Sequence, residues 1–562
     1  MKPARNSGRF KHRIDSEHEW HAVRDQVYDA GAWLVITSPA TTGRDSEFVP
    51  RVQWQRPETH AAIRTWLGLT DITDAEFDAK LAEIESHLPS EFALSELRQV
   101  VTMVGKGVDP ADARQVFKEG ARQRVAEWFD ANDERSRRSL MTVTAAAFLG
   151  HCSQRTFESC LIELEHRVAR AEPAADGEIE PPSERADLIP ELRSAMVDDK
   201  SLLRLKPVES GITARSVVAF REDSYREHVI TELWRRMDVI FWNTVRDWLC
   251  DILSRSSDDE ALHEQTIAQA LLELASIAFD EVAEAYLEPW SRGEHGLACR
   301  DMAIFVLWDM CAGKVFAPAA LQIAARWGES GTVLQKWTAA YALSGVLGFS
   351  YPEEATRQLW RLIIRSGNRD AEERCAELAE LFARLATRSP QADAVLIFLK
   401  RKHGDARLGP RGRLLVEFAI TQVLIIQDDV TGWSAIFSHL DNVPNQEGFV
   451  AQLWAIALRR SDFRRRALDA LLDGLRDLTE ISAEPEQTTR ALAAAFAQAL
   501  PPRECRSLTH NLTARHRQRT AAATKQRAIR RTTRSKKAAQ SEIRVAELVR
   551  ILLAPLAIDH PN

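Results

Sequence analysis

The pattern of hydrophobic positions between residues 300 and 365 repeats, and it predicts two similar helix pairs in succession. The first copy runs from Met302 to Trp327 and the second from Val333 to Arg365. Each copy has an apolar segment, a glycine, a proline and a second helical segment that contains a tryptophan. A period of this size is typical of a stacked helical repeat, in which each helix pair buries its apolar face against the next.

Glycine and proline mark the ends of the predicted helices within each copy. Gly313 and Gly348 are 35 residues apart, and Pro318 and Pro352 are 34 apart. Glycine is favoured just after a helix because it tolerates the turn, and proline is favoured in the first turn because its missing N–H has no helical partner there. We therefore predict that each glycine closes a first helix and that each proline opens a second.

Helical patterns continue from Tyr225 to about Leu500, and strand patterns stop in that region. The region contains prolines at 289, 318, 352 and 390, which are separated by 29, 34 and 38 residues. This drift favours a degenerate repeat of the HEAT type over the stricter tetratricopeptide pattern. The fold class we predict is therefore mainly α, with an α-solenoid of HEAT-like helix pairs over residues 223–502 and a concave face along it.

Three segments precede the predicted repeats. Residues 1–55 contain one continuous apolar stretch, Ala32 to Ser38, which is typical of a buried strand and is interpreted as a remnant α/β segment. Residues 56–108 show amphipathic helices and are interpreted as a helical lid. Residues 109–222 are interpreted as a winged-helix-like domain with three helices and an acidic, proline-rich loop at 171–190. Its hairpin wing is predicted from Leu202 to Lys206 and from Ser216 to Phe220.

Residues 503–562 are predicted to form a basic linker and a C-terminal amphipathic helix, whose apolar face would cap the repeats or dock on a partner. The chain carries a net charge of −7, yet the window from Thr513 to Lys537 holds no acidic residue. Phosphate contacts would have to come from this window, since the rest of the chain is acidic. The candidate phosphate-contacting residues are Arg515, Arg517, Arg519, Lys525, Arg527, Arg530, Arg531, Arg534, Lys536 and Lys537.

Any contact of this basic window with nucleic acid would be non-specific and sensitive to salt. The window contains no aromatic residue on which a base could stack. The alternative is that its side chains are simply solvated along a linker.

The chain offers little that would bind a metal or a cofactor. His18 and His21 share a helical face near His12, but no further ligand follows at a suitable spacing, so we predict neither a metal nor a cofactor. The seven cysteines form no CxxC pair and indicate a reducing compartment. We find no secretory signal and no run of about 18 apolar residues, and we predict a cytoplasmic protein without a membrane span.

Tryptophan is frequent in the predicted repeats, with ten of the 15 tryptophans between residues 234 and 454. Trp290, Trp327 and Trp360 recur at corresponding positions, which favours packing between helix pairs. The alternative is that one of these rings contacts a ligand. No GxSxG, HExxH or dinucleotide glycine motif is present, and we therefore predict a protein that is not an enzyme.

The order of elements resembles the actinobacterial STAND ATPases, a class of signal-transduction NTPases. The resemblance is carried by LVITS within residues 32–38, AEWFDAND from Ala126 to Asp133, VVAFREDSYREHVITELW from Val217 to Trp234, and the HEAT-like pairs that follow. It implies a regulatory helical sensor that comes after a nucleotide-binding module. The strand at residues 32–38 would correspond to the strand that follows the Walker B strand.

The Walker motifs of that family are absent from this sequence. A Walker A loop needs GxxxxGK[ST], but Val100 and Trp308 stand where the first glycine would precede Gly105-Lys106 and Gly313-Lys314. The sequence therefore predicts a sensor or scaffold that binds a protein or peptide partner. One alternative is a nucleic-acid-associated helical-repeat protein that uses residues 513–537. Another is a subunit that completes a separately encoded P-loop ATPase.

Overall fold

The computed structural model describes residues 58–67, 81–85, 88, 92, 94–131, 137–150, 152–171, 201–210, 213–255, 261–313, 315–443, 445–529 and 535–556. Over these residues the chain is mainly helical with one two-stranded sheet, which confirms the predicted mainly α class. The predicted strand at 32–38, the histidines near residue 18 and nearly all of the acidic loop lie outside the described residues.

The described residues between 58 and 88 and between 92 and 117 belong to a first compact unit. Its described helices are α2 (Thr59–Leu67), α4 (Leu94–Gly105) and α5 (Pro110–Ala113), with a further helical stretch at residues 81–85. Ile63, Leu97, Val101 and Phe117 are buried together in its small core. The helical pattern that suggested a lid is therefore confirmed as helix.

Residues 89–91 and 118–562 form the second unit, which begins with helices and a hairpin. The predicted strands pair antiparallel over a longer range than expected, with Leu203 opposite Phe220, and β2 packs against α7 and α8. The hairpin is thus confirmed, while the winged-helix comparison stays a prediction. The elements are α6 (Gln115–Asp130, from residue 118 in this unit), α7 (Arg137–Leu149), α8 (Gln154–Ala171), β1 (Leu203–Ser210), β2 (Thr213–Phe220), α9 (Tyr225–Arg236), α10 (Val239–Arg255) and α11 (Ala261–Ala275).

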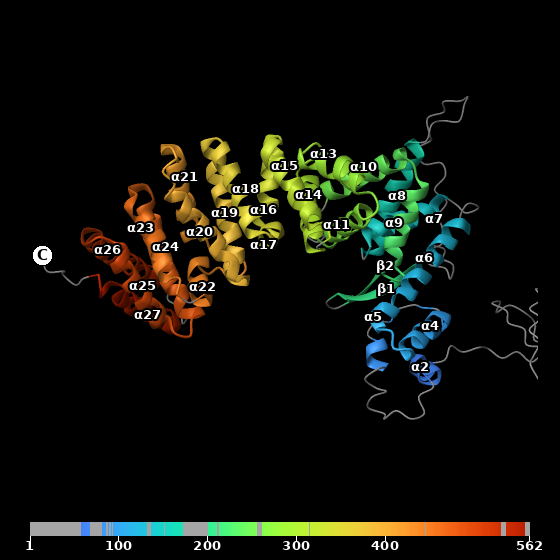
Figure 1. Ribbon diagram of the computed structural model, residues 1–562, viewed down its shortest axis with the longest axis horizontal. Coiled ribbons are helices and arrows are strands. Elements are labelled where there is room, and N and C mark those ends of the chain that lie inside the picture. The colour runs from blue at the N-terminus through green and yellow to red at the C-terminus, as the bar shows by residue number, and fades with distance from the viewer. Residues whose placement is uncertain are drawn as a thin grey trace, which may run out of the picture. The chain divides into compact units, whose positions relative to one another are not determined.

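From Phe279 onward this unit is a series of helices that pack in two rows (Figure 1). The elements are α12 (Phe279–Glu281), η4 (Val282–Leu287), α13 (Glu288–Ser291), α14 (Leu297–Ala312), α15 (Ala317–Ser330), α16 (Val333–Ser344), α17 (Val346–Ser350), α18 (Pro352–Arg365), α19 (Asn368–Arg388), η5 (Pro390–Ala392), α20 (Asp393–His403), α21 (Pro410–Ile425), α22 (Ala435–Asn442), α23 (Glu447–Arg459), α24 (Ser461–Ile481) and α25 (Pro485–Ala499).

The first row consists of α14, α16, α19, α22 and α24, each packed on the next. The second row consists of α15, α18, α21, α23 and α25, with α20 contacting α18 and α21. Helices of the two rows pack on each other, so that their shared interior is apolar. Trp290, Trp327 and Trp360 lie in this interior, which confirms the packing role predicted for them.

The predicted helix boundaries are largely confirmed, with one error. Gly313 follows the last residue of α14, and Pro318 and Pro352 stand in the first turns of α15 and α18. Gly348 does not close the first helix of the second copy, because α16 already ends before Gly345 and Gly348 lies inside α17. Residue 345 has to be a glycine because α14 approaches it closely: a Cβ atom there would overlap the indole of Trp308.

Pro289 departs from the pattern of the later prolines. It lies within a continuous helical run rather than at the start of one, and a wide π-helical turn, η4, precedes it. Proline cannot donate to the helix and its ring needs space near the carbonyl four residues earlier, and such strain is commonly relieved by a π-bulge. The Glu288 N–H accordingly bonds to the Ala283 carbonyl, five residues back.

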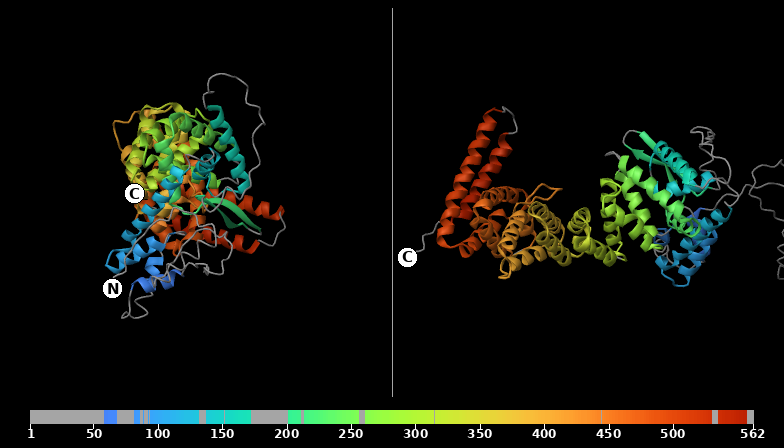
Figure 2. Two further views of the ribbon diagram at one scale, coloured as in Figure 1. Left: turned by 90° about the vertical axis from the view of Figure 1, so that its right-hand side faces the viewer. Right: turned by 90° about the horizontal axis from the view of Figure 1, so that it is seen from above.

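The C-terminal region differs from the predicted linker. The basic window is helical through residue 529 as part of α26 (Pro502–Ile529), and α27 (Ser535–Leu553) packs beside it (Figure 2). Val545, Leu548 and Leu552 are buried against α24 and α25, which confirms the predicted capping face. Ile543, an apolar residue nearer the start of the same helix, is exposed.

All seven cysteines are free thiols, and only Cys160 is not fully buried. Cys299 on α14 directs its thiol toward the Cys250 carbonyl on α10 at 4.0 Å. Among the described residues, no helix combines the length and the apolar content that crossing a membrane requires.

Candidate interaction surfaces

The ten candidate phosphate-contacting residues lie on α26, on α27 and in the segment between them. Arg515 and Arg519 are held by carboxylates of α24, whereas Arg517 is exposed. The side chains of Lys525, Arg527, Lys536 and Lys537 lie outside the described residues although their backbone is helical, and Arg530, Arg531 and Arg534 lie outside them altogether.

The contacts of Arg515 and Arg519 attach α26 to the first row of helices. Arg515 donates from Nε and Nη2 to the two carboxylate oxygens of Asp469, both at 2.7 Å. Arg519 pairs with Asp473 and donates from Nη1 to the Asp469 carbonyl at 3.1 Å. The hydrogen bond that Arg515 donates to Asp469 raises the pKa of Arg515, as expected for a bidentate charged pair. A phosphate would have to compete with these carboxylates for the two arginines.

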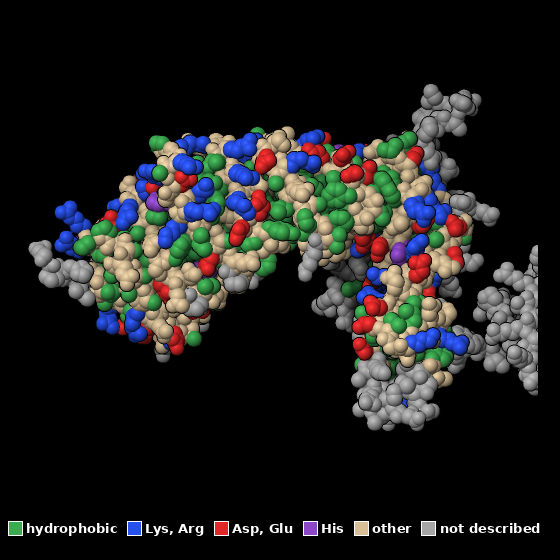
Figure 3. Space-filling view, viewed as in Figure 1, with side chains coloured by type: hydrophobic (Ala, Val, Ile, Leu, Met, Phe, Trp, Pro, Cys, Tyr) green, Lys and Arg blue, Asp and Glu red, His purple; other side chains and the backbone are tan. Residues whose placement is uncertain are grey.

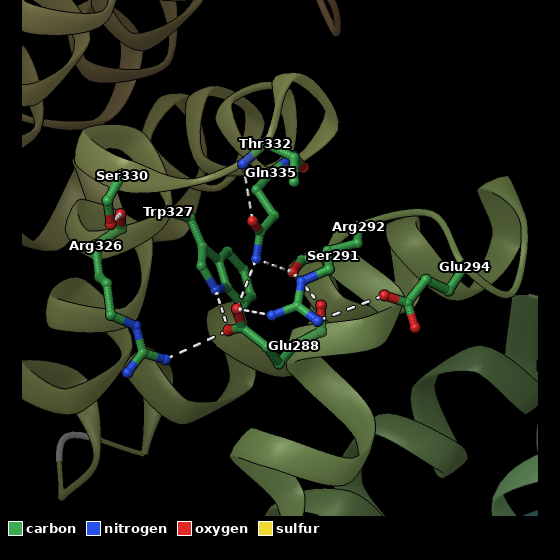
Figure 4. Close-up of polar contacts among 9 residues, drawn as sticks. All are labelled: Glu288, Ser291, Arg292, Glu294, Arg326, Trp327, Ser330, Thr332 and Gln335. Carbon is green, nitrogen blue, oxygen red and sulfur yellow. Dashed lines mark hydrogen bonds and ion pairs between the residues drawn. The ribbon is translucent and has the colours of Figure 1, made fainter.

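A second polar cluster joins neighbouring helix pairs at Glu288 (Figure 4). The Oε1 atom of Glu288 accepts hydrogen bonds from Gln335 Nε2 and Arg292 Nη2, both at 2.9 Å. The Oε2 atom accepts from Trp327 Nε1 at 2.8 Å and from Arg326 Nη2 at 3.4 Å. One carboxylate therefore links α13, α15 and α16.

The environment of Glu288 keeps its carboxyl group ionised. Burial raises its pKa, but the hydrogen bonds from Trp327 and Gln335 and the charges of nearby arginines outweigh burial and hold the pKa below its ordinary value. Gln335 is itself fixed, because it closes a capping box with Thr332 at the start of α16 and donates to Ser291 Oγ at 3.2 Å. This cluster fixes the start of α16, the helix that carries a stacked aromatic pair.

Trp337 and Tyr341 form that pair on α16. Their rings stack with centroids 5.7 Å apart and planes inclined by 26°. On the neighbouring helix α14, Phe305 meets Trp308 edge-on at 5.4 Å. Phe305 and Tyr341 are each nearly 40% exposed (38% and 39%), whereas the tryptophans between the rows are buried. Hydrophobic side chains gather over α14 and α16 in Figure 3. Clustered exposed aromatic rings of this kind mark interaction sites.

Carboxylates flank the aromatic pair. Glu377 on α19 accepts a hydrogen bond from Ser344 Oγ at 2.7 Å. Burial raises the pKa of Tyr341, and the negative charges of Glu377, Asp301 and Glu373 raise it further, so these carboxylates lie near the phenol. We call the surface formed by these groups the acidic–aromatic strip, and its residues are Asp301, Phe305, Trp337, Tyr341, Glu373, Glu377 and Glu380.

The acidic half of the strip is partly desolvated. Burial raises the pKa of Glu377, and it also raises the pKa of Glu380, to which the charges of Asp429 and Glu377 contribute. Arg384 acts in the opposite direction on both glutamates without reversing the shift. Carboxylates in this state gain from a cation that replaces their lost water.

Sequence reasoning did not single out the strip. It identified the tryptophans that recur with the repeat, and those are buried. The available signal was that Trp337 and Tyr341 are four residues apart on one helical face, and that Glu373, Glu377 and Glu380 share a face of a later helix, α19. That the two faces are neighbours depends on the packing of α16 against α19, which the sequence does not reveal.

Other polar sites are occupied by internal contacts. A cavity of about 530 Å³ between α8 and α10 is bordered by the ion pairs of Arg167 with Asp251 and of Arg255 with Glu163. His439 is fully buried and lies 2.9 Å from Asp393, and burial lowers its pKa. Within the described ranges, no three histidine, cysteine, aspartate or glutamate side chains are grouped as metal ligands.

No protein-family model matches the sequence, and no curated protein is significantly similar to it.

Proposed function

We propose that this chain is a non-catalytic sensor or scaffold that binds a protein partner through the acidic–aromatic strip. The observation that carries this proposal is the stacked pair of Trp337, which is partly exposed, and Tyr341, which is exposed, beside desolvated carboxylates. Tryptophan and tyrosine are the residues that most often dominate binding energy at protein interfaces. A helical-repeat array is suited to this role because it presents side chains of successive helices on one continuous surface.

The proposal includes the finer architecture that the sequence suggested. In it, the two rows of helices are a HEAT-like solenoid, and the chain works in a reducing compartment such as the cytoplasm, in the manner of the regulatory part of a STAND ATPase. The two-row packing and the seven free thiols support these points. The nucleic-acid alternative has less support, since Arg515 and Arg519 already contact carboxylates of α24.

The proposal is tested by capturing partners from the native cell with the tagged full-length protein. We expect the double variant Trp337→Ser/Tyr341→Ser to lose its retained partner by at least about tenfold, which corresponds to the loss of one interface hot spot. The matched control is Ile397→Ser, which removes a 55% exposed apolar side chain from α20. Equal retention by the wild-type protein and both variants would exclude the strip as the binding surface.

A further inference from the structure

Two acidic side chains of the strip, Glu377 and Glu380, lack the ion pairs that the strip's other carboxylates, Asp301 and Glu373, form. Glu377, Glu380 and the nearby Asp429 form no ion pair with another described residue. The other two carboxylates are paired, Asp301 with Arg300 at 3.0 Å and Glu373 with Arg369 at 3.8 Å, while Arg384 donates to the Ser344 carbonyl at 3.0 Å. The strip therefore retains two carboxylates without an ion pair, Glu377 (8% exposed) and Glu380, close to the exposed ring of Tyr341.

The same row of helices shows how such carboxylates are satisfied when a partner helix is present. Asp469 and Asp473 on α24 form ion pairs with Arg515 and Arg519, two residues of the neighbouring helix α26. The geometry with Asp469 is bidentate, with both contacts at 2.7 Å. No described helix supplies arginines to Glu377 and Glu380 of α19 in the way that α26 supplies them to α24.

Two other contacts show that this protein combines arginine with an aromatic ring and a carboxylate. Arg236 lies over the Phe129 ring at 5.4 Å and contacts Asp130 at 2.6 Å. Arg124 lies over the Tyr225 ring at 5.8 Å and contacts Glu222 at 3.0 Å. A guanidinium group suits such sites because it is planar, stacks on aromatic faces and donates to two oxygens at once. Glu377 and Glu380 lie on the strip with the Trp337–Tyr341 rings, but no described arginine forms an ion pair with either of them.

On the basis of the binding role proposed above, we propose that the acidic–aromatic strip binds an arginine-bearing segment of a partner protein. An arginine of that segment stacks on the Trp337–Tyr341 pair and donates to the carboxylates of Glu377 and Glu380. The charge complementarity is the same as that between α24 and α26. Lysine fits less well, because its ammonium group is a compact, strongly hydrated charge without a planar face.

The test uses the full-length protein and a fluorescein-labelled peptide of alternating arginine and alanine, with binding followed by fluorescence anisotropy. We expect the lysine–alanine peptide to bind several-fold more weakly and the glutamate–alanine peptide not to bind. Glu377→Gln/Glu380→Gln should weaken binding of the arginine peptide about tenfold, and Trp337→Leu should weaken it similarly. The matched control is Glu329→Gln/Glu353→Gln, which removes two carboxylates from the second-row helices α15 and α18.

Three results would overturn this inference. They are equal loss of binding in the strip and control variants, equal affinity for the arginine and lysine peptides, and self-association of the wild-type chain that the strip variants abolish. The last result would assign the strip to a second copy of this chain. If Trp337→Ser/Tyr341→Ser loses its cellular partner while arginine peptides fail to bind, the proposed function stands and only the ligand chemistry is wrong.

Discussion

At the scale of single residues, Glu288 shows how this protein stabilises a charge between helix pairs. Its side chain is 25% exposed, so the carboxylate has lost part of its water. Donors from α13, α15 and α16 replace that water, and two of them, Gln335 and Trp327, are neutral groups at 2.8 to 2.9 Å. Without the carboxylate, the N–H groups of Trp327 and Gln335 would lose their acceptor in a partly buried contact between helix pairs.

We predict that Glu288→Gln lowers the free energy of unfolding at pH 7 by about 1–3 kcal/mol. The pKa of Glu288 is lower in the folded chain than its ordinary value of 4.5, so its ionised form contributes stability above that value. This contribution is lost as the pH falls through the lower, folded-state pKa. The difference between the wild-type protein and the variant should therefore shrink in acid. Urea denaturation at neutral and acidic pH measures it.

Glu294→Gln is the matched control, because Glu294 contacts the same Arg292 but is about half exposed (51%). An exposed pair of this kind contributes little, and we expect a change within about 0.5 kcal/mol. If Glu288→Gln changed the free energy of unfolding by the same amount at neutral and acidic pH, the charge of Glu288 would not contribute to the stability of this contact.

At the scale of elements, α26 is positioned by two arginines on one of its faces. The helix carries few apolar residues, and its contacts with α24 include the pairs of Arg515 and Arg519 with Asp469 and Asp473. Each of these four side chains is about a quarter to a third exposed (26–32%), so water screens the pairs only in part.

We predict that Arg515→Gln/Arg519→Gln speeds amide hydrogen exchange in residues 513–529 by at least about threefold, because charge-assisted hydrogen bonds that hold α26 are lost. Exchange in α18, on the second row, should not change. Arg517→Gln is the matched control, since Arg517 lies on the same helix and is exposed. Unchanged exchange in the double variant would mean that apolar packing alone holds α26.

Much of the element structure could be predicted from the sequence, and the errors have identifiable causes. Pro318 and Pro352 fix helix starts because proline has a local steric effect that does not depend on tertiary contacts. Gly345 and Gly348 could not be told apart, since the choice depends on where Trp308 of another helix packs. The basic window looked like a linker because the carboxylates that hold it are some 46 residues earlier in the sequence.

The same limit applies to the candidate site. The buried tryptophans could be predicted because they recur with the repeat. The strip could not, because Trp337, Tyr341 and Glu377 come together only when α16 packs on α19. Tertiary proximity of this kind leaves no local pattern in the sequence.

At the scale of the whole molecule, opposite charges are separated along the chain. The net charge of −7 is the sum of a basic window near the C-terminus, which has no acidic residue, and the rest of the chain, which is acidic. In the second unit, two arginines of the basic window pair with carboxylates of α24, whereas Glu377 and Glu380 of the strip form no ion pair with another described residue. This distribution is expected to draw cationic segments of partners toward the strip and to make the association sensitive to ionic strength.

The most direct measurement is photo-crosslinking in the native cell from a benzoylphenylalanine placed at Tyr341, with Ile397 as the matched control position. The account predicts a discrete protein adduct from position 341, with the crosslinked peptide of the partner containing arginine, and no such adduct from position 397. The absence of an adduct at 341, or the same adducts from both positions, would contradict a partner-binding role for the strip.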